Sequence, residues 1–412
     1  MSKKNKKSRK SKVTLLTKLR SLSKKTVITA LSVFCGIVLI TTAVITVRTI
    51  NKRRADRTVR IAFYGLSEEQ INMLKGKIPE EENIILEYKI ISDDDFDPAV
   101  IKAKCDMLFT WKGEVTDILS ASAEDLPKRV LETMPSSLRN QKCLPIILDN
   151  CELSFSKQVL ENLNSDVPSS FDTLQDFLNS AKGLVFSPYY CNGGDDRIFI
   201  DFIGALVMAK GGLSAYNKLI DELRKAEKFE DVIDIKLDEK DCSLRALLDM
   251  LKNWPVEGLT HPSWFNGRGN DLLYFAEDKQ LGCFFTLLSE HRKMPYNVVK
   301  NYETSFFPTN HSAINYGVIA PALSVMLFSD NSNSKRYIYN FFTEEAQEEF
   351  SDATGLAPVH SHVQAYDLQA DNVRYWAASC KGGAVPDLYL AVYQRKPEAL
   401  KNLCNEIRNY LR

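Results

Sequence analysis

Aromatic and polar side chains stand where several of the predicted strands end. These residues are Tyr64, Trp111, Lys112, Tyr189 and Phe285. In α/β proteins, ligands generally bind at the carboxyl ends of the strands. Aromatic rings and a few polar groups at such an edge are typical of sites that bind a small molecule without changing it chemically. Packing in the core is the alternative for each aromatic residue.

Patterns that mark catalytic, metal or phosphate sites do not occur in the sequence. It contains no Gly-x-Ser-x-Gly, no His-Glu-x-x-His and no dinucleotide fingerprint. His360-x-His362 has no third metal ligand nearby, so we expect these histidines on the surface. Gly193-Gly194-Asp195-Asp196 predicts a turn with solvated acids, because a phosphate loop requires Gly-Lys-Ser/Thr. We therefore expect no enzyme, no metal and no cofactor.

Nine cysteines are spread along the chain without a Cys-x-x-Cys pair. This spacing argues against a zinc site. Cys105, Cys143 and Cys283 lie in apolar runs, where free cysteine packs as a small hydrophobic residue. We expect scattered buried thiols, and Cys143–Cys151 is the close pair to test for a disulfide.

An uncharged apolar segment at residues 26–47 is long enough to span a membrane. At about 1.5 Å per residue, a helix of this length crosses a hydrocarbon core of about 30 Å. The segment is too long for a cleaved signal and has no Ala-x-Ala exit, so we expect a retained single-pass anchor. Residues 1–25 contain eleven Lys and Arg and no acid. This cluster places the N-terminus in the cytoplasm and the rest of the chain outside the inner membrane, in a periplasmic or extracellular position.

The net charge of zero hides a strong asymmetry along the chain. Residues 1–60 contain 17 basic residues and one acid, which leaves 36 basic and 52 acidic residues in the remainder. An acidic body of this kind excludes nucleic acid as a partner, and the basic segments beside the apolar helix face the lipid headgroups.

Strands and helices alternate along the body, which predicts an α/β architecture with largely parallel sheets. Ser67-Glu-Glu-Gln70 predicts a helix start with a capping box, and Gly211-Gly212 predicts a helix end. The predicted strands span residues 59–64, 84–91, 105–110, 144–148, 153–155 and 183–187, and the predicted helices include 171–181, 197–210 and 244–251.

The order of these elements resembles that of the maltose-binding-like extracellular solute-binding proteins of ABC importers. The resemblance covers residues 59–412 and rests on weak segments in the right order rather than on one motif. Two of them are Val167-Pro-Ser-Ser-Phe-Asp-Thr-Leu and Gly258-Leu-Thr-His-Pro262. The strongest block runs from Tyr316-Gly-Val-Ile-Ala-Pro through the helix after Thr343 to Gly355-Leu-Ala-Pro-Val359.

The resemblance implies a two-lobed type II periplasmic-binding-protein fold, with a hinge and a central cleft that closes over a ligand. Lobe one would comprise 58–152 plus 303–343, and lobe two 153–302 plus 344–412, after a 48–57 linker. Sugar-binding members stack aromatic rings on their ligands. In this chain Tyr189 resembles such a ring, and Tyr389 lies near a late aromatic of the family. Ser187 stands where the family has an acid, which puts maltodextrin in doubt.

These features predict a membrane-anchored receptor that delivers a small solute, a carbohydrate above all, to the membrane subunits of an ABC importer. The alternative hypothesis is a tethered sensor or assembly protein that reuses the fold without transport, since fold does not fix function. Lys112 or Arg197 in the cleft would favour an acidic ligand.

Overall fold

The computed structural model describes residues 24–237 and 242–412. The chain divides into two compact units, Met1–Thr58 and Val59–Arg412. Helix α2 (Lys24–Arg57) is the described part of the first unit, and the second unit is called the body here. The predicted basic segment 1–25 lies almost wholly outside the described residues.

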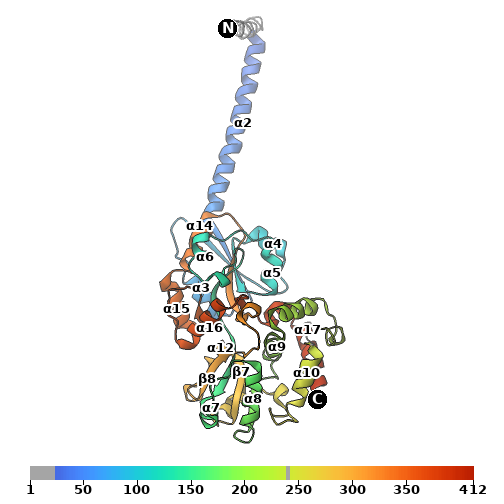
Figure 1. Cartoon of the computed structure of the whole chain (residues 1–412). Helices are drawn as coiled ribbons and strands as arrows, with labels where there is room; N and C mark the ends of the chain where they lie inside the picture. The colour runs from blue at the N-terminus through green and yellow to red at the C-terminus, as the bar shows by residue number, and fades with distance from the viewer. Residues whose placement is uncertain (1–23, 238–241) are drawn as a thin grey trace, which may run out of the picture. The chain divides into compact units, whose positions relative to one another are not determined.

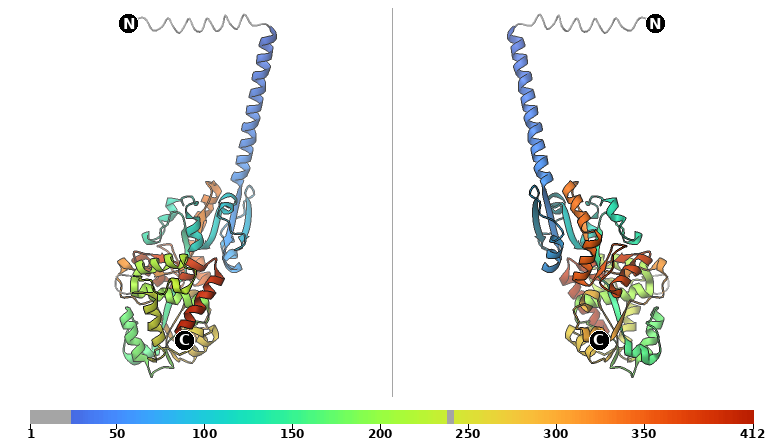
Figure 2. Two further views of the ribbon diagram at one scale, coloured as in Figure 1. Left: turned by 90° about the vertical axis from the view of Figure 1, so that its right-hand side faces the viewer. Right: turned by 90° about the vertical axis from the view of Figure 1, so that its left-hand side faces the viewer.

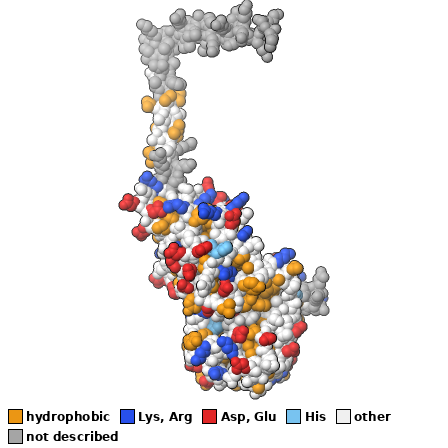
Figure 3. Space-filling model, turned by 60° about the vertical axis from the view of Figure 1, so that its left-hand side comes forward, with side chains coloured by type: hydrophobic (Ala, Val, Ile, Leu, Met, Phe, Trp, Pro, Cys, Tyr) orange, Lys and Arg blue, Asp and Glu red, His pale blue; other side chains and the backbone are white. Residues whose placement is uncertain are grey.

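Helix α2 is 34 residues long and contains the predicted membrane segment 26–47. Its described apolar side chains are exposed, among them Leu39, Ile40 and Ile45, and Figure 3 shows apolar side chains along it. The hydroxyls of Thr42 and Thr46 donate to carbonyls four residues earlier. Such bonds satisfy the hydroxyl groups within the helix itself, as a lipid environment requires.

The predicted linker at residues 48–57 is helical, because α2 continues without a break to Arg57. This segment has no glycine or proline and is rich in arginine and lysine, which are good helix formers. A helix therefore leads directly into the first strand.

Among the described residues, one helix is long and apolar enough to cross a membrane by composition, and it is α9 (Asp196–Lys225). However, 83% of the apolar 18-residue stretch of α9 is buried inside the body, so α9 is a core helix. The described apolar stretch of α2 is the shorter Gly36–Val47.

The body contains a six-stranded and a four-stranded sheet, each in its own half (Figure 1), and the turned views of Figure 2 show the same division. The six-stranded order is β11-β4-β10-β3-β1-β2, and the four-stranded order is β6-β7-β5-β8. The first sheet consists of β1 (Thr58–Tyr64), β2 (Ile85–Ile91), β3 (Met107–Trp111), β4 (Leu144–Leu148), β10 (Ala322–Leu327) and β11 (Ala357–Pro358). The second consists of β5 (Cys151–Ser156), β6 (Ser187–Cys191), β7 (Leu281–Leu287) and β8 (Tyr302–Phe306).

Helices cover both sheets. Those of the first half are α3 (Glu68–Lys75), α4 (Pro98–Lys104), α5 (Glu114–Ser120), α6 (Lys128–Leu131), α14 (Ser332–Asn340) and α15 (Glu344–Thr354). Those of the second half are α7 (Lys157–Leu163), α8 (Phe171–Ala181), α9, α10 (Leu244–Asn253), α11 (Gly269–Glu277), α12 (Leu288–His291), α13 (Tyr296–Val299) and α17 (Pro397–Leu411). Between the halves lie α16 (Leu368–Ser379), the paired β9 (Val318–Ile319) and β12 (Ala384–Val385), and the π-helix η5 (Tyr389–Tyr393).

Strand β1 shows why the six-stranded sheet is buried on both faces. Phe63 lies in the main hydrophobic core, whereas its neighbours Ala62 and Tyr64 lie in a second apolar cluster. Successive side chains of a strand point to opposite faces of the sheet. A sheet with helices on both faces therefore needs apolar residues at successive positions. β1 pairs in parallel with β3, whereas β10 pairs antiparallel with both β3 and β4.

The sheet pairings divide the chain differently from the predicted lobes. Residues 303–306 belong to β8, which pairs with β5 in the four-stranded sheet. Helix α15 packs on β4, and β11 pairs with β4 in the six-stranded sheet, so residues 344–358 accompany that sheet. The chain therefore leaves the four-stranded half after β8 and returns to it only after β11. The predicted lobe boundaries at 302/303 and 343/344 were therefore both placed too early in the sequence.

Several local predictions are confirmed. Ser67 and Gln70 form the capping box of α3, and Thr343 caps α15 through a bond from Ala346 N. Gly212, at φ 72°, breaks α9 into two helical segments at the predicted helix end. The α/β architecture is confirmed, but the prediction of largely parallel sheets is wrong, because β10 pairs antiparallel with β3 and β4, and β5 pairs antiparallel with β7 and β8.

Removal of residues 1–57 should leave the body folded and soluble without detergent, because the body is a separate compact unit. We expect a cooperative melt at a temperature close to that of the full chain, measured by circular dichroism. The full chain should remain with membranes in a flotation assay. A truncated chain that fails to fold would show that α2 is more than a tether.

Candidate functional site

A pocket lies at the carboxyl edge of the four-stranded sheet. β6 and β7 run parallel there, with Cys191 opposite Phe285, so their following loops meet. The pocket has a volume of about 540 Å³. Its polar lining includes Asn192, Arg197, Asn270, Thr286, Glu290 and Lys293.

The turn after β6 is shaped by two glycines at close approaches. A Cβ at Gly193 would lie 2.5 Å from Phe265 Cα, and one at Gly194 would lie 2.6 Å from Gly267 O. Asp195 then caps α9 by accepting hydrogen bonds from the backbone N–H groups of Arg197 and Ile198. The predicted turn is therefore present, but its acids have structural partners. The turn fixes Arg197 in the first helical turn beside the pocket.

Arg197 faces two fully buried carboxylates. Its Nη2 lies 3.1 Å from Asp387 Oδ2, and its Nε lies 3.6 Å from Asp201 Oδ2. Its guanidinium also stacks over the Tyr389 ring, 5.1 Å from the centroid. The backbone N–H of Tyr389 donates to Asp201 Oδ1. These contacts join α9 to the segment that follows β12.

Burial raises the pKa of Asp201 far above its ordinary value, and the nearby Asp387 raises it further, while Arg197 opposes both effects. Burial also raises the pKa of Asp149, although Ser289 donates to this carboxylate through its backbone N–H and its hydroxyl. For Arg197, burial disfavours the cation, but Asp387 and Asp201 outweigh that effect and raise its pKa. The positive charge of Arg197 thus neutralises internal carboxylates, which argues against an acidic ligand at this position.

The predicted residues of the six-stranded half contact other parts of the chain. Tyr64 is buried, donates to the Asp93 carboxylate, and packs 5.3 Å from Phe96. Burial and that hydrogen bond raise its pKa. Lys112 Nζ donates to Ala384 O at 3.1 Å. Trp111 is the last residue of β3 and is partly exposed.

Tyr189 and Phe285 are core residues, against the prediction of ligand contact. The strand after α8 is β6 (Ser187–Cys191) and not 183–187, so Tyr189 lies inside it. Tyr189 stacks on Phe202 at 4.9 Å and meets Trp254 edge-on at 5.3 Å. Phe285 is likewise inside β7 and fully buried. Both side chains are enclosed because their strands extend further than the sequence pattern indicated.

The residues that do line the pocket were mostly missed. Asn192 follows the true end of β6, and Thr286 stands beside Phe285 near the end of β7. Both residues could have been found from the sequence if the ends of β6 and β7 had been predicted correctly. Tyr389 was predicted, and it is the candidate aromatic that lies against Arg197.

The segment 389–395 covers the ends of β1 and β3. Gln394 accepts from Val115 N and donates to Thr110 Oγ1, both at 3.4 Å. A Cβ at Gly113 would lie 2.2 Å from Leu390 O, so this close approach requires glycine. The Arg395 guanidinium lies 4.0 Å from the centre of the Phe96 ring. One segment therefore links the neighbourhood of Tyr64 to that of Arg197.

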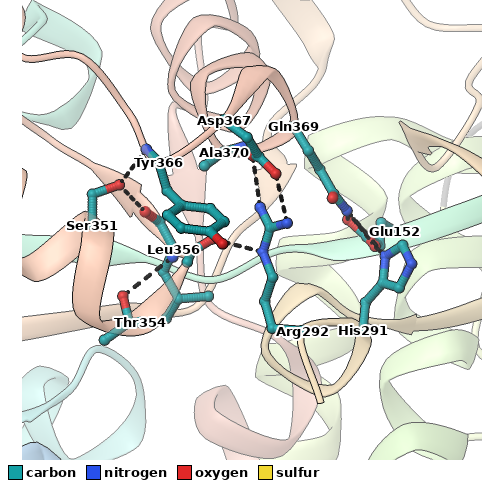
Figure 4. Close-up of polar contacts among 11 residues, drawn as sticks. Glu152, His291, Arg292, Ser351, Thr354, Leu356, Tyr366, Asp367, Gln369 and Ala370 are labelled. Carbon is teal, nitrogen blue, oxygen red and sulfur yellow. Dashed lines mark hydrogen bonds and ion pairs between the residues drawn. The ribbon is translucent and has the colours of Figure 1, made fainter. Parts of the chain in front are cut away.

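A polar network ties α12 to the start of α16 (Figure 4). Buried His291 Nδ1 lies 2.7 Å from Glu152 Oε1, and Gln369 donates to both oxygens of Glu152. The next residue, Arg292, forms two 2.7 Å bonds to Asp367, the cap of α16. Because α16 also packs on β11 and β8, this network fixes a junction between the two halves.

The histidine pair is placed differently from the prediction. His362 is exposed, but His360 is buried, and burial lowers its pKa. Within residues 24–237 and 242–412, no group of three or more His, Cys, Asp or Glu side chains could hold a metal ion. Cys143 and Cys151 are both buried free thiols.

No protein-family profile and no curated protein matches the chain. Solved structures do match over 86% of its length. The bacterial solute receptor AcbH, described as preferring β-D-galactopyranose, has a TM-score of 0.66, 12% identity and 98% of its own chain covered. RafE from Streptococcus pneumoniae has a TM-score of 0.62, 14% identity and 96% covered. A Bacillus licheniformis sugar transporter protein in complex with stachyose has a TM-score of 0.54, 12% identity and 98% covered. The body therefore has the two-lobed α/β fold of solute-binding proteins.

Replacement of Arg197 by methionine should destabilise the body by about 3 kcal/mol at pH 7, because it leaves buried carboxylates without their cation. In the variant, Arg197 no longer opposes the effects of burial and of Asp387, so the pKa of folded Asp201 lies above that of the unfolded chain. Stability is then present at low pH and lost as the pH rises through the folded values. Urea unfolding of R197M at pH 5 and pH 8 should show the larger deficit at pH 8. R197K, which keeps the charge, is the control, and an equal loss in both variants would contradict the electrostatic account.

Replacement of Asp367 by asparagine isolates the charge of the Arg292 pair, because asparagine also caps helices. Burial alone would raise the pKa of Asp367, but the hydrogen bonds from Arg292 and Ala370 outweigh it, so the pKa lies below its ordinary value. A lowered carboxylate pKa contributes stability above the unfolded value, and this is lost as the pH falls through the folded one. We expect D367N to be about 1 kcal/mol less stable than the parent at pH 7. The difference should shrink as the pH falls below the ordinary pKa of an aspartate, and a difference independent of pH would rule out the ion pair as its source.

Proposed function

We propose that the chain is a membrane-anchored receptor that binds a small, uncharged polar solute, a carbohydrate above all, for an ABC-type importer. The fold carries this proposal. The body covers 96–98% of proteins described as sugar receptors or sugar-bound, among them RafE and AcbH. Such coverage leaves little of those proteins without a counterpart here. The same likeness supports a role in binding rather than in catalysis.

The pocket chemistry supports an uncharged ligand. Asn192 Oδ1 is buried and accepts no hydrogen bond from the described residues. Leaving a buried acceptor unpaired is costly, and a ligand hydroxyl would satisfy it. Charged groups of the lining already have partners: Glu290 pairs with Lys293, and Arg197 pairs with Asp387. Tyr389 is the aromatic residue we propose as a stacking surface, with Trp111 as a candidate on the other half.

The sequence and the exposed apolar side chains of α2 support the proposed anchor. We place the N-terminus in the cytoplasm, residues 26–47 in the inner membrane and the body outside. The exposed apolar side chains of α2 support this arrangement. The membrane subunits of an importer are the proposed protein partners.

The uninterrupted α2 favours a second candidate function, that of a tethered sensor. A receptor needs only a tether, whereas a sensor would use a continuous helix to pass movement of the body to the membrane. Insertion of a short Gly-Ser segment between Arg57 and Thr58 separates the two hypotheses. Transport in cells should survive the insertion, and helix-borne signalling should not.

A ligand screen on the full chain in detergent tests the proposed function. A specific sugar should raise the melting temperature by mass action, and titration calorimetry should give a saturable curve. N192A should bind that sugar about tenfold more weakly, since a hydrogen bond to the ligand is lost. N253A, an exposed asparagine at the end of α10, is the matched control. The proposal fails if neutral mono- and oligosaccharides leave the melting temperature unchanged. The assigned pocket fails if N192A binds the sugar with the same affinity as N253A.

A further inference from the structure

A second cavity borders the same turn that shapes the candidate pocket. It has a volume of about 520 Å³ and reaches Gly194. The lining side chains are Asn266 and Arg268, from the segment between η3 (Trp264–Asn266) and α11, and Asn405, Arg408, Asn409 and Arg412, from α17. None of them is acidic. We call this the basic cavity.

The charge of the basic cavity stands out against the rest of the body. Residues 61–412 contain 36 basic and 52 acidic residues, and Figure 3 shows the two signs interspersed over the face in view. A cavity lined by three arginines and no acidic residue is therefore unusual here, although one of them, Arg408, is paired with Asp196. The last turn of α17 favours cations through its dipole, which accounts for Arg408 and Arg412. It does not account for Arg268, which comes from a different segment.

The three arginines differ in how far their donors are used. Arg408 is buried, donates three bonds to the carbonyls of Gly193 and Phe265, and pairs with Asp196 at 2.6 Å. Arg412 donates to Asn409 Oδ1, and Arg268 is exposed. Within the described parts of the chain, neither of these two forms a salt bridge. Arg408 is therefore held in place as part of the cavity wall. The guanidinium groups of Arg268 and Arg412 keep N–H donors that can bind a ligand.

We propose that the basic cavity binds a small oxyanion, of the phosphate or polycarboxylate class. Guanidinium groups match the paired oxygens of such ions, and charge-assisted hydrogen bonds are the stronger kind. The carboxamides of Asn266 and Asn405 supply neutral donors beside them. An anion here also reduces the repulsion between arginines held close together.

The basic cavity is joined to the candidate solute pocket through Arg408. Its bonds to Gly193 and Asp196 hold the turn between Asn192 and Arg197, which both line that pocket. Its bond to Phe265 O holds the loop that leads to Asn270 on the other side of the pocket. An anion that orders this wall would strengthen solute binding, and the solute would strengthen anion binding equally. This coupling rests on the proposed function, whereas the anion site itself does not.

Calorimetry of the full chain in detergent, with inorganic phosphate and citrate as probes at low ionic strength, tests the site. We expect saturable binding, and binding at least about tenfold weaker in R268Q/R412Q, because two charged donors are lost. The control K128Q/R129Q removes two exposed positive charges from α6, beside the other sheet, and should bind like the parent. Sodium chloride at matched ionic strength should produce no comparable heat.

Two results would overturn the proposal. One is the absence of saturable binding of either probe, and the other is an equal loss in the test and control variants. Because no sugar is present, failure of this experiment leaves the proposed solute function untouched. Conversely, anion binding without any sugar ligand would retain the site and reject only the coupling.

Discussion

The buried carboxylates around Arg197 constrain how the parts of the body meet. Asp149 lies on the crossing between β4 and β5, Asp201 on α9, and Asp387 on the segment that follows β12. An ionised carboxylate away from water is stable only with a cation or several hydrogen-bond donors. Arg197, Ser289 and the N–H of Tyr389 supply these. None of the three segments could move far without breaking these hydrogen bonds and ion pairs. The positions of α9, the crossing and the late segment are therefore fixed together.

Polar pairs rather than apolar packing join the two halves at several points. Arg224 of α9 pairs with Asp117 of α5 at 2.6 Å and also donates to Ala391 O. Arg292 and Asp367 form a comparable link at the start of α16. Partly exposed ion pairs contribute little net stability but have strict geometry. These pairs therefore fix how the halves meet, while the apolar core that is continuous across both halves supplies most of the packing.

The fold was predictable from the sequence to a larger extent than the site. Capping boxes, glycine stops and the strand order are local signals, and Ser67, Thr343 and Gly212 occupy the predicted roles. The strand after α8 was placed four residues early because 183–187 is apolar, whereas the sheet is formed by Ser187–Cys191. That shift moved Tyr189 from the expected strand end into the core and hid Asn192. The carboxylate cluster could not be foreseen, because Asp149, Asp201 and Asp387 meet only through tertiary contacts.

In the receptor that we propose, the internal neutralisation at Arg197 also sets the kind of ligand that the pocket selects. A site with a free guanidinium gains affinity for acids through charge, but here the guanidinium is committed to Asp387 and Asp201. Recognition then depends on amides and hydroxyls such as Asn192 and Thr286, which read hydrogen-bond geometry. The residues that line the pocket include no aromatic ring, and one face of Tyr389 already carries the guanidinium. A ligand therefore has at most one face of this ring on which to stack. These constraints together favour a compact polyhydroxylated solute over a long oligosaccharide, which needs successive stacking rings.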